Sequence, residues 1–127
     1  MLSERWRFPY KGRNKENWEE GEMIKLPVPK TIPLASRRYR IILKSLRDEN
    51  WLGTISHNQN LVIEIDPVQG PTGRATSLWH EIFHGIDKVW QLKLDESVVG
   101  SLAEGLNQVM QDGFRIELDW SDIPNVK

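Results

Sequence analysis

One short segment has the residue types and the spacing of a metal site, the sequence HEIFH at residues 80–84. It lies within residues 75–90, whose apolar pattern is typical of one continuous helix. Because a helix turns by about 100° and rises about 1.5 Å per residue, His80 and His84 share a face and can reach one metal ion. Glu81 lies within reach of a water on that ion. The segment therefore predicts zinc ligated by the two histidines, with Glu81 as general base of a hydrolase.

Two histidines leave a hydrolytic zinc site one protein ligand short. The H-E-x-x-H-x-x-G-x-x-H pattern would supply a third histidine six residues after the second, but Trp90 stands there. Carboxylates of the next predicted helix are the alternative, and the candidates are Asp95, Glu96 and Glu104. The third ligand is therefore expected to be an acid.

Helical geometry favours Glu96 among these acids. Glu96 shares one helical face with three small residues: Gly100, Ala103 and Asn107. Such a face can approach the first helix closely, and Gly100 and Gly105 both predict tight packing, because glycine is otherwise costly inside a helix. Glu104 lies about 80° away around the axis, and Asp95 is placed as the helix cap. Glu104 and Asp95 stay open as alternatives.

The chain as a whole limits the classes of protein it can belong to. With 127 residues it is long enough for one domain. The net charge of −1 argues against a protein built globally to bind nucleic acid or anionic lipid. There is no cysteine, which excludes disulfides and thiolate ligands. Without a signal peptide or an 18-residue apolar run, we expect a cytoplasmic protein with no membrane partner.

Residue patterning predicts an α+β fold in which a small antiparallel sheet packs against the H-E-x-x-H helix and a second helix closes the site. Residues 38–44 alternate as a half-buried strand, and 52–56 with 61–65 form a hairpin. Thr72 is the expected cap of a helix ending near residue 90, and Asp95 that of a helix through residue 112. Gly113 ends this helix, and a last strand or extended tail covers residues 114–120.

The sequence also predicts one domain boundary and leaves two rival functions open. Residues 1–30 are expected to be an extended or poorly ordered arm, and 31–127 a single domain, because periodicity begins only after a proline-rich stretch. Five basic residues between Arg37 and Arg47 could contact phosphates, which keeps a nucleic-acid-binding accessory protein as an alternative. A zinc-binding interaction module without hydrolysis is the other alternative. In such a module, the two histidines would bind zinc without any catalytic role for Glu81.

Two stretches together resemble a known family. One runs TSLWHEIFHGID at residues 76–87, and the other DESVVGSLAEGLNQVM at residues 95–110. They resemble small phage and prophage proteins of the ImmA/IrrE type, which look like minimal gluzincin metallopeptidases, over about residues 31–112. The Glu-Ala-Asn core that better-known members carry in the second helix is absent here. The arm before residue 31 has no counterpart in that resemblance.

The resemblance implies a zinc-dependent metallopeptidase, encoded by a phage or prophage and acting on a protein or peptide in the bacterial host. Carried over by residue, it implies that His80, His84 and an early glutamate matching Glu96 hold zinc, and that Glu81 is the general base. Hydrolysis also needs a donor to the oxyanion. The sequence offers His57, Tyr39 and an arginine for that role without choosing among them.

Overall fold

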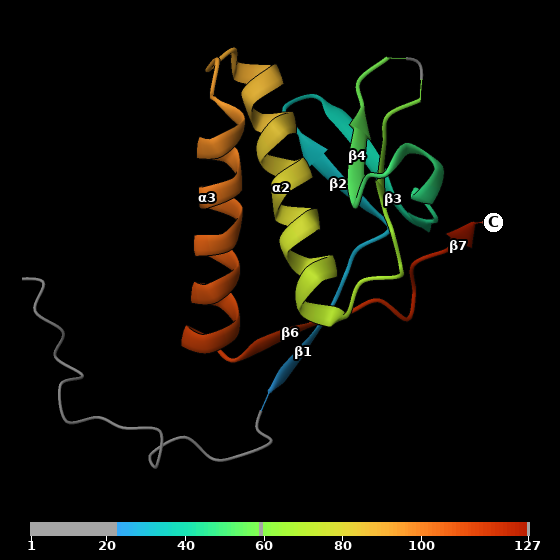
Figure 1. The fold of residues 1–127 in the computed structure, drawn as a ribbon, viewed down its shortest axis with the longest axis vertical. Helices are drawn as coiled ribbons and strands as arrows, with labels where there is room; N and C mark the ends of the chain where they lie inside the picture. The colour runs from blue at the N-terminus through green and yellow to red at the C-terminus, as the bar shows by residue number, and fades with distance from the viewer. Residues whose placement is uncertain (1–22, 59, 127) are drawn as a thin grey trace, which may run out of the picture.

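The computed structural model describes residues 23–58 and 60–126. Its fold is α+β, as predicted, with helices α2 (Pro71–Trp90) and α3 (Glu96–Gln108) on one side of a small sheet. Helix α2 lies between α3 and the sheet, so it contacts both layers (Figure 1). No helix in these two stretches combines the length and the hydrophobicity needed to cross a lipid bilayer.

Seven short strands occur in the described part of the chain: β1 (Ile24–Pro27), β2 (Thr31–Leu34), β3 (Arg37–Lys44), β4 (Gly53–Ser56), β5 (Val62–Ile65), β6 (Ile116–Asp119) and β7 (Asn125–Val126). The main sheet has the order β2-β3-β5-β4, and β7 pairs with the end of β3. The predicted strand at residues 38–44 is thus β3, and the predicted hairpin is the antiparallel pair β4 and β5.

The sheet is mixed, whereas an antiparallel sheet was predicted. Strands β2 and β3 are antiparallel, as are β4 and β5, but β3 runs parallel to both β5 and β7. The physical reason is that the chain leaves β3 through a 3₁₀ turn at Arg47–Glu49 and enters β4 at the far edge, so that β5 returns between them. Alternation of side chains identifies a strand but leaves the direction of its partner open.

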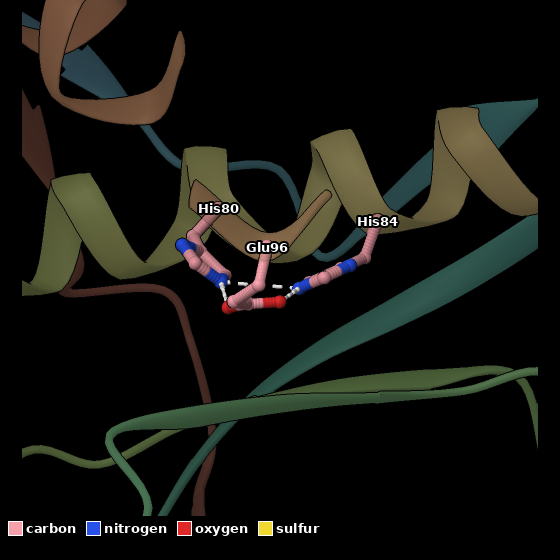
Figure 2. A group of neighbouring side chains, drawn as sticks. All are labelled: His80, His84 and Glu96. Atoms are coloured by element: carbon pink, nitrogen blue, oxygen red, sulfur yellow. Dashed lines mark hydrogen bonds and ion pairs between the residues drawn. The ribbon is translucent and has the colours of Figure 1, made fainter. Parts of the chain in front are cut away.

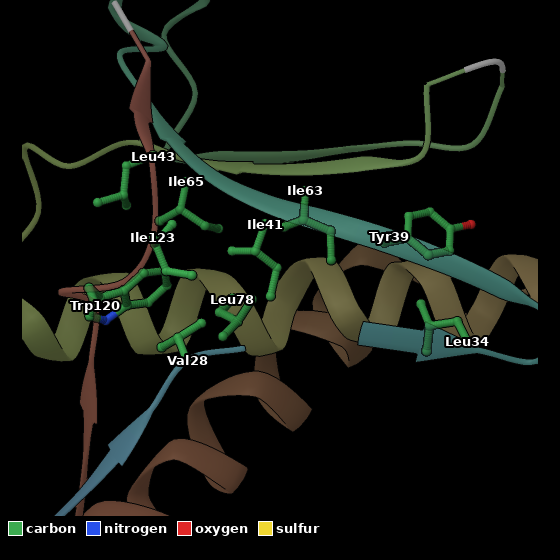
Figure 3. Packing of buried hydrophobic residues seen from close by; sticks show 10 residues of the cluster. All are labelled: Val28, Leu34, Tyr39, Ile41, Leu43, Ile63, Ile65, Leu78, Trp120 and Ile123. Atoms are coloured by element: carbon green, nitrogen blue, oxygen red, sulfur yellow. The ribbon is translucent and has the colours of Figure 1, made fainter. Parts of the chain in front are cut away.

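The core lies between α2 and the sheet (Figure 3). Its central side chains on β3 and β5 are fully or almost fully buried, and they are Tyr39, Ile41, Leu43, Ile63 and Ile65. Leu78 of α2 packs against them, and Trp120 and Ile123, which follow β6, belong to the same cluster. Burying a residue such as Ile63 contributes about 1.5–3 kcal/mol. This packing fixes α2 on the sheet and therefore fixes the face that carries the two histidines.

The expected boundary at residue 31 comes too late. Strand β1 pairs in parallel with β6, and Val28, which is 2% exposed, belongs to the core. Residues 24–30 are therefore part of the domain. The partner strand β6 covers Ile116–Asp119, the central part of the strand or tail expected at residues 114–120. The rest of the predicted arm, residues 1–22, lies outside the described residues.

Both ends of α2 are set by local chemistry. The helix begins at Pro71 after Gly70, and the expected cap, Thr72, lies inside it and donates its hydroxyl to Gln111 Oε1 at 3.3 Å. Proline suits the first helical position because its φ is already helical. At the other end Gln91 takes a left-handed conformation, and Asp87 accepts a hydrogen bond from the Leu94 N–H at 3.2 Å. Asp87 therefore shapes the connector that leads into α3.

Helix α3 starts one residue after Asp95, as predicted, but Asp95 does not cap it with its side chain. Its backbone carbonyl accepts hydrogen bonds from Val98 and Val99 instead, both at 3.0 Å. The helix passes into a π-helical turn at Val109–Gly113, so the expected end at Gly113 holds. The connection between α2 and α3 is short, and the two helices are consequently antiparallel neighbours (Figure 1).

Candidate metal centre

Three side chains from two helices converge on one point (Figure 2). His80 Nε2 lies 2.7 Å from Glu96 Oε1, and His84 Nε2 lies 3.0 Å from Glu96 Oε2. The two Nε2 atoms are 3.1 Å apart. The expected spacing of the histidines on α2 thus brings both imidazoles to one side of the helix, and Glu96 closes the group from the start of α3. A group of this composition could hold a metal ion.

The distances fit a small tetrahedral cation. With bonds of about 2.0–2.1 Å to zinc, neighbouring donor atoms of a tetrahedron lie about 3.3 Å apart. The two Nε2 atoms are 3.1 Å apart, and each lies 2.7 or 3.0 Å from a different oxygen of Glu96, so all three separations are slightly shorter than this value. Two imidazole nitrogens and one carboxylate oxygen are a donor set that zinc accepts. In the described residues this group has three protein donors, which leaves a fourth tetrahedral position.

Helix α3 can bring Glu96 close to the histidines because mostly small side chains line the face that it turns toward α2. Val99 and Ala103 are fully buried, Asn107 is 7% exposed, and a Cβ added at Gly100 would lie 4.0 Å from His80 Cε1. Gly105 was expected to pack closely as well, but a Cβ there would meet nothing within 4 Å. That expectation is wrong, since Gly105 lies on the open side of the helix.

The other two acids do not join the histidines. Glu104 lines a groove nearer the start of α2, two turns along α3 from Glu96. Asp95 precedes the helix and is exposed. Neither belongs to the group of donor atoms that surrounds His80 and His84. The structure therefore places Glu96 in the position of a third ligand, although ligation itself stays a prediction.

Glu81 lies beside this group and is buried. It is 7% exposed, and a Cβ added at Gly53 of β4 would lie 3.2 Å from its Oε2 atom. Burial raises the pKa of the Glu81 carboxyl to about 7; the positive charge of His80 opposes this rise, and the Glu96 carboxylate adds to it. A carboxyl with a pKa near neutrality can accept and return a proton at physiological pH. These are the properties required of the predicted general base.

The carboxyl and the nearest histidine open into one cleft. It has a volume of about 350 Å³ and lies between α2 and the segment that enters β4, with Glu81, His80, Ser77, Leu52 and Gly53 among its lining residues. Asp66 holds that segment in place, because its backbone N–H donates a hydrogen bond to the Leu52 carbonyl oxygen at 3.0 Å. A water or a small part of a substrate in this cleft can therefore touch both the metal group and Glu81.

The raised pKa makes a prediction for the metal-free protein. Because the folded-state pKa of Glu81 is about 7, against 4.5 for the free side chain, the folded state retains a proton that the unfolded state has lost. Its contribution to stability is present below about pH 4.5 and is lost as the pH rises through about 7. At about 1.4 kcal/mol per pKa unit the loss is about 3 kcal/mol.

Urea unfolding of chelator-treated protein at pH 4 and pH 8 measures this effect. The wild type should lose about 3 kcal/mol more than Glu81→Gln over that interval, because glutamine has no proton to lose. Both proteins keep His80 and His84, so the comparison isolates residue 81. Equal pH dependence in the two proteins would contradict a buried, proton-retaining carboxyl.

A second pair of polar side chains lies at the other end of β4. Tyr39 is fully buried, and its hydroxyl lies 3.0 Å from His57 Nδ1. Burial lowers the pKa of the His57 imidazole, and the nearby Lys88, Arg37 and His84 add to this. The contact with Tyr39 therefore holds the His57 ring in one orientation.

The basic residues of the nucleic-acid alternative are spread over β3 and its ends. Arg37 donates to the His57 carbonyl oxygen at 3.0 Å, Arg38 to Thr31 Oγ1 at 2.9 Å, and Lys44 lies 3.6 Å from Glu64. The nucleic-acid alternative stays a prediction, and no contact among the described residues favours it.

The sequence did not identify Gly53 or the cleft. Glycine inside a strand often marks a close approach of another group, and Gly53 was that signal, since it faces Glu81. The cleft depends on the loop before β4, for which the residue pattern makes no geometric prediction. A local motif identifies the helix face, whereas the wall opposite that face comes from tertiary packing.

Comparison with known proteins adds no function to this geometry. No protein-family model, no curated protein and no solved structure matches the chain. The assignment therefore depends on the residues alone: His80, His84 and Glu96 form a group that could hold a metal ion beside a buried carboxyl.

Proposed function

We propose that the chain is a zinc-dependent metallopeptidase. One observation carries the proposal, the convergence of His80, His84 and Glu96 within 4.8 Å of one another, next to the buried Glu81. Structural zinc sites usually have four protein ligands, whereas catalytic sites have three and keep a position for water. The three donors in the described residues support the catalytic type.

Access to the site supports the same proposal. The side chains of His80 and His84 are 26% and 30% exposed, and that of Glu96 is 70% exposed. Solvent and substrate can therefore reach the position that the three donors face. A closed structural site would be expected to shield its ligands more completely.

Each residue of the site has a defined task in the proposed hydrolysis. Zinc, when bound, supplies a Lewis acid that polarises the substrate carbonyl and acidifies water. Glu81 accepts the proton of the attacking water and then delivers it to the leaving amide nitrogen. His57, held by Tyr39 at 3.0 Å, is the candidate donor to the oxyanion.

The sheet edge supports a polypeptide substrate. Strand β4 pairs with β5 alone among the described strands, so its other edge has unused hydrogen-bonding groups. It passes along α2 from Gly53, beside Glu81, through Ile55, beside Gly85, to the segment with His57. An extended peptide that adds to such an edge would cross the metal group.

The resemblance to ImmA/IrrE-type proteins supports the same activity. With it comes the further proposal that the chain is encoded by a phage or prophage and acts in the cytoplasm of the bacterial host. A zinc-binding module without hydrolysis remains the rival, because such a module needs the three ligands and not the buried carboxyl.

Zinc-dependent cleavage of peptides tests the proposal. Protein purified without chelator should carry close to one zinc per chain and should generate new peptide ends in a proteome-derived peptide mixture. A chelator should stop the cleavage, and added zinc should restore it. One bound zinc with no new peptide ends, in mixtures from several bacterial hosts, would favour the non-catalytic module.

A further inference from the structure

The described surface has a second groove that the proposed chemistry does not use. It has a volume of about 510 Å³ and lies between the first half of α2 and the second half of α3. Leu52, Thr76 and Ser77 line both this groove and the catalytic cleft. The two spaces are therefore neighbours, and a chain lying in the cleft can extend toward the groove.

The groove is lined by polar and acidic side chains. Glu104 and Asp112 stand on its α3 side, and no lysine, arginine or histidine is among the described residues that line it. Gln69 and Gln111 place amide groups in the wall, and their Oε1 atoms accept hydrogen bonds from Ser77 and Thr72. The charge of this lining repels anions and attracts a cationic group.

Asn107 gives independent evidence for a ligand. It is only 7% exposed and lines the groove, yet its carboxamide makes no hydrogen bond to any described residue. The side-chain oxygen of Asn107 is thus an acceptor in the wall of an acidic groove that no described residue uses.

We propose that this groove binds a lysine or arginine side chain of the peptide whose backbone occupies the catalytic cleft. The inference rests on the proposed peptidase function and adds a sequence preference to it. Both side chains carry only donors and a positive charge, which matches the unpaired Asn107 oxygen and the two acids.

The position of the basic residue follows from helix geometry. Ser77 is three residues before His80 on α2, and Gly73 is seven residues before it. Measured along the helix axis, the groove therefore begins about 4.5 Å from His80 and extends to about 10.5 Å from it. An extended peptide advances about 3.3 Å per residue. The basic residue is therefore within about three residues of the scissile bond.

Binding of designed peptides tests the preference without requiring turnover. The protein is the full chain with Glu81→Gln, zinc-loaded and ¹⁵N-labelled, so that bound peptide stays intact. The probes are three alanine-serine hexapeptides identical except for one position, which is lysine, norleucine or glutamate. The lysine peptide should bind at least about threefold more tightly than the norleucine peptide, as expected for solvent-accessible charge pairs, and it alone should shift the side-chain amide signals of Asn107.

Matched variants identify the groove as the source of the preference. Adding Glu104→Gln and Asp112→Asn should abolish the difference between the lysine and norleucine peptides. Adding Asp48→Asn and Asp122→Asn, which change the net charge equally and do not line the groove, should leave the difference intact. An unchanged preference in the first variant, or no binding of the lysine peptide at millimolar concentration, would overturn the inference.

The same probes separate this inference from the peptidase proposal. If the zinc-loaded wild type cleaves peptides that have no basic residue near the cut bonds, the peptidase proposal is supported and the groove assignment is overturned. Lysine-dependent binding that shifts Asn107, without cleavage of any peptide, would support the groove and overturn the hydrolysis.

Discussion

Replacing Glu96 by alanine is expected to weaken zinc binding by more than about 100-fold. The substitution removes a donor oxygen that lies 2.7 Å from His80 Nε2 and leaves two neutral imidazoles to hold a divalent cation. Loss of a group that merely supports a ligand costs about 10–100-fold in metal affinity, so loss of a ligand itself should exceed that range. Competition with a chromophoric zinc chelator measures the change.

Glu104→Ala is the matched control for this experiment. It removes the same side chain from the same helix, at a place that the structure separates from the histidines. Its zinc affinity should stay within about threefold of wild type, because an exposed charge at a distance contributes little. If Glu104→Ala weakens zinc binding more than Glu96→Ala, the arrangement of α3 around the site is wrong.

Replacing Glu81 by glutamine should reduce peptide hydrolysis by about 10²–10⁴-fold and leave the zinc content near one per chain. Glutamine keeps the shape of the side chain that packs against Gly53 but cannot accept the proton of the attacking water. The separation of the two readouts matters, since a merely structural role for Glu81 would change metal content or stability instead of turnover.

This prediction is tested by comparing the cleavage rates of wild type and Glu81→Gln on a peptide that the wild type cuts. Zinc content is measured on the same samples. A proteome-derived mixture supplies such a peptide because it presents many different sequences to the enzyme at once. His80→Ala serves as the contrasting control, because it should lose both zinc and turnover. Equal rates for wild type and Glu81→Gln, both zinc-loaded, would assign the cleavage to something other than Glu81.

The sequence predicts the parts of this molecule whose structure is local. The spacing of His80 and His84 within one helix, the strand that contains Tyr39, and the β4–β5 hairpin all follow from periods of 3.6 and 2 residues. Helical arithmetic also placed Glu96 on the inner face of α3. The short connection after Trp90 limits how the two helices can pack. For this reason the helical periodicity of each segment was enough to predict a contact between them.

Other features are determined by partners far away in the chain. Nothing in residues 24–27 indicates that they pair with residues 116–119, so the domain was predicted to begin seven residues later than β1 does. The parallel direction of β3 and β5 depends on how the loop through Arg47 crosses the sheet edge. The polar groove likewise requires two helices, and Asn107 in the sequence alone was only one small residue of a stripe.

A structure of the zinc-soaked protein, with data collected at the zinc absorption edge, tests the central claim most directly. We expect one anomalous peak within bonding distance of His80 Nε2, His84 Nε2 and a Glu96 oxygen, with a water in the fourth position beside the Glu81 carboxyl. The contrary result is a zinc ion elsewhere, or one at this site with a fourth protein ligand in place of water, which would make the site structural and leave Glu81 without a reaction to catalyse.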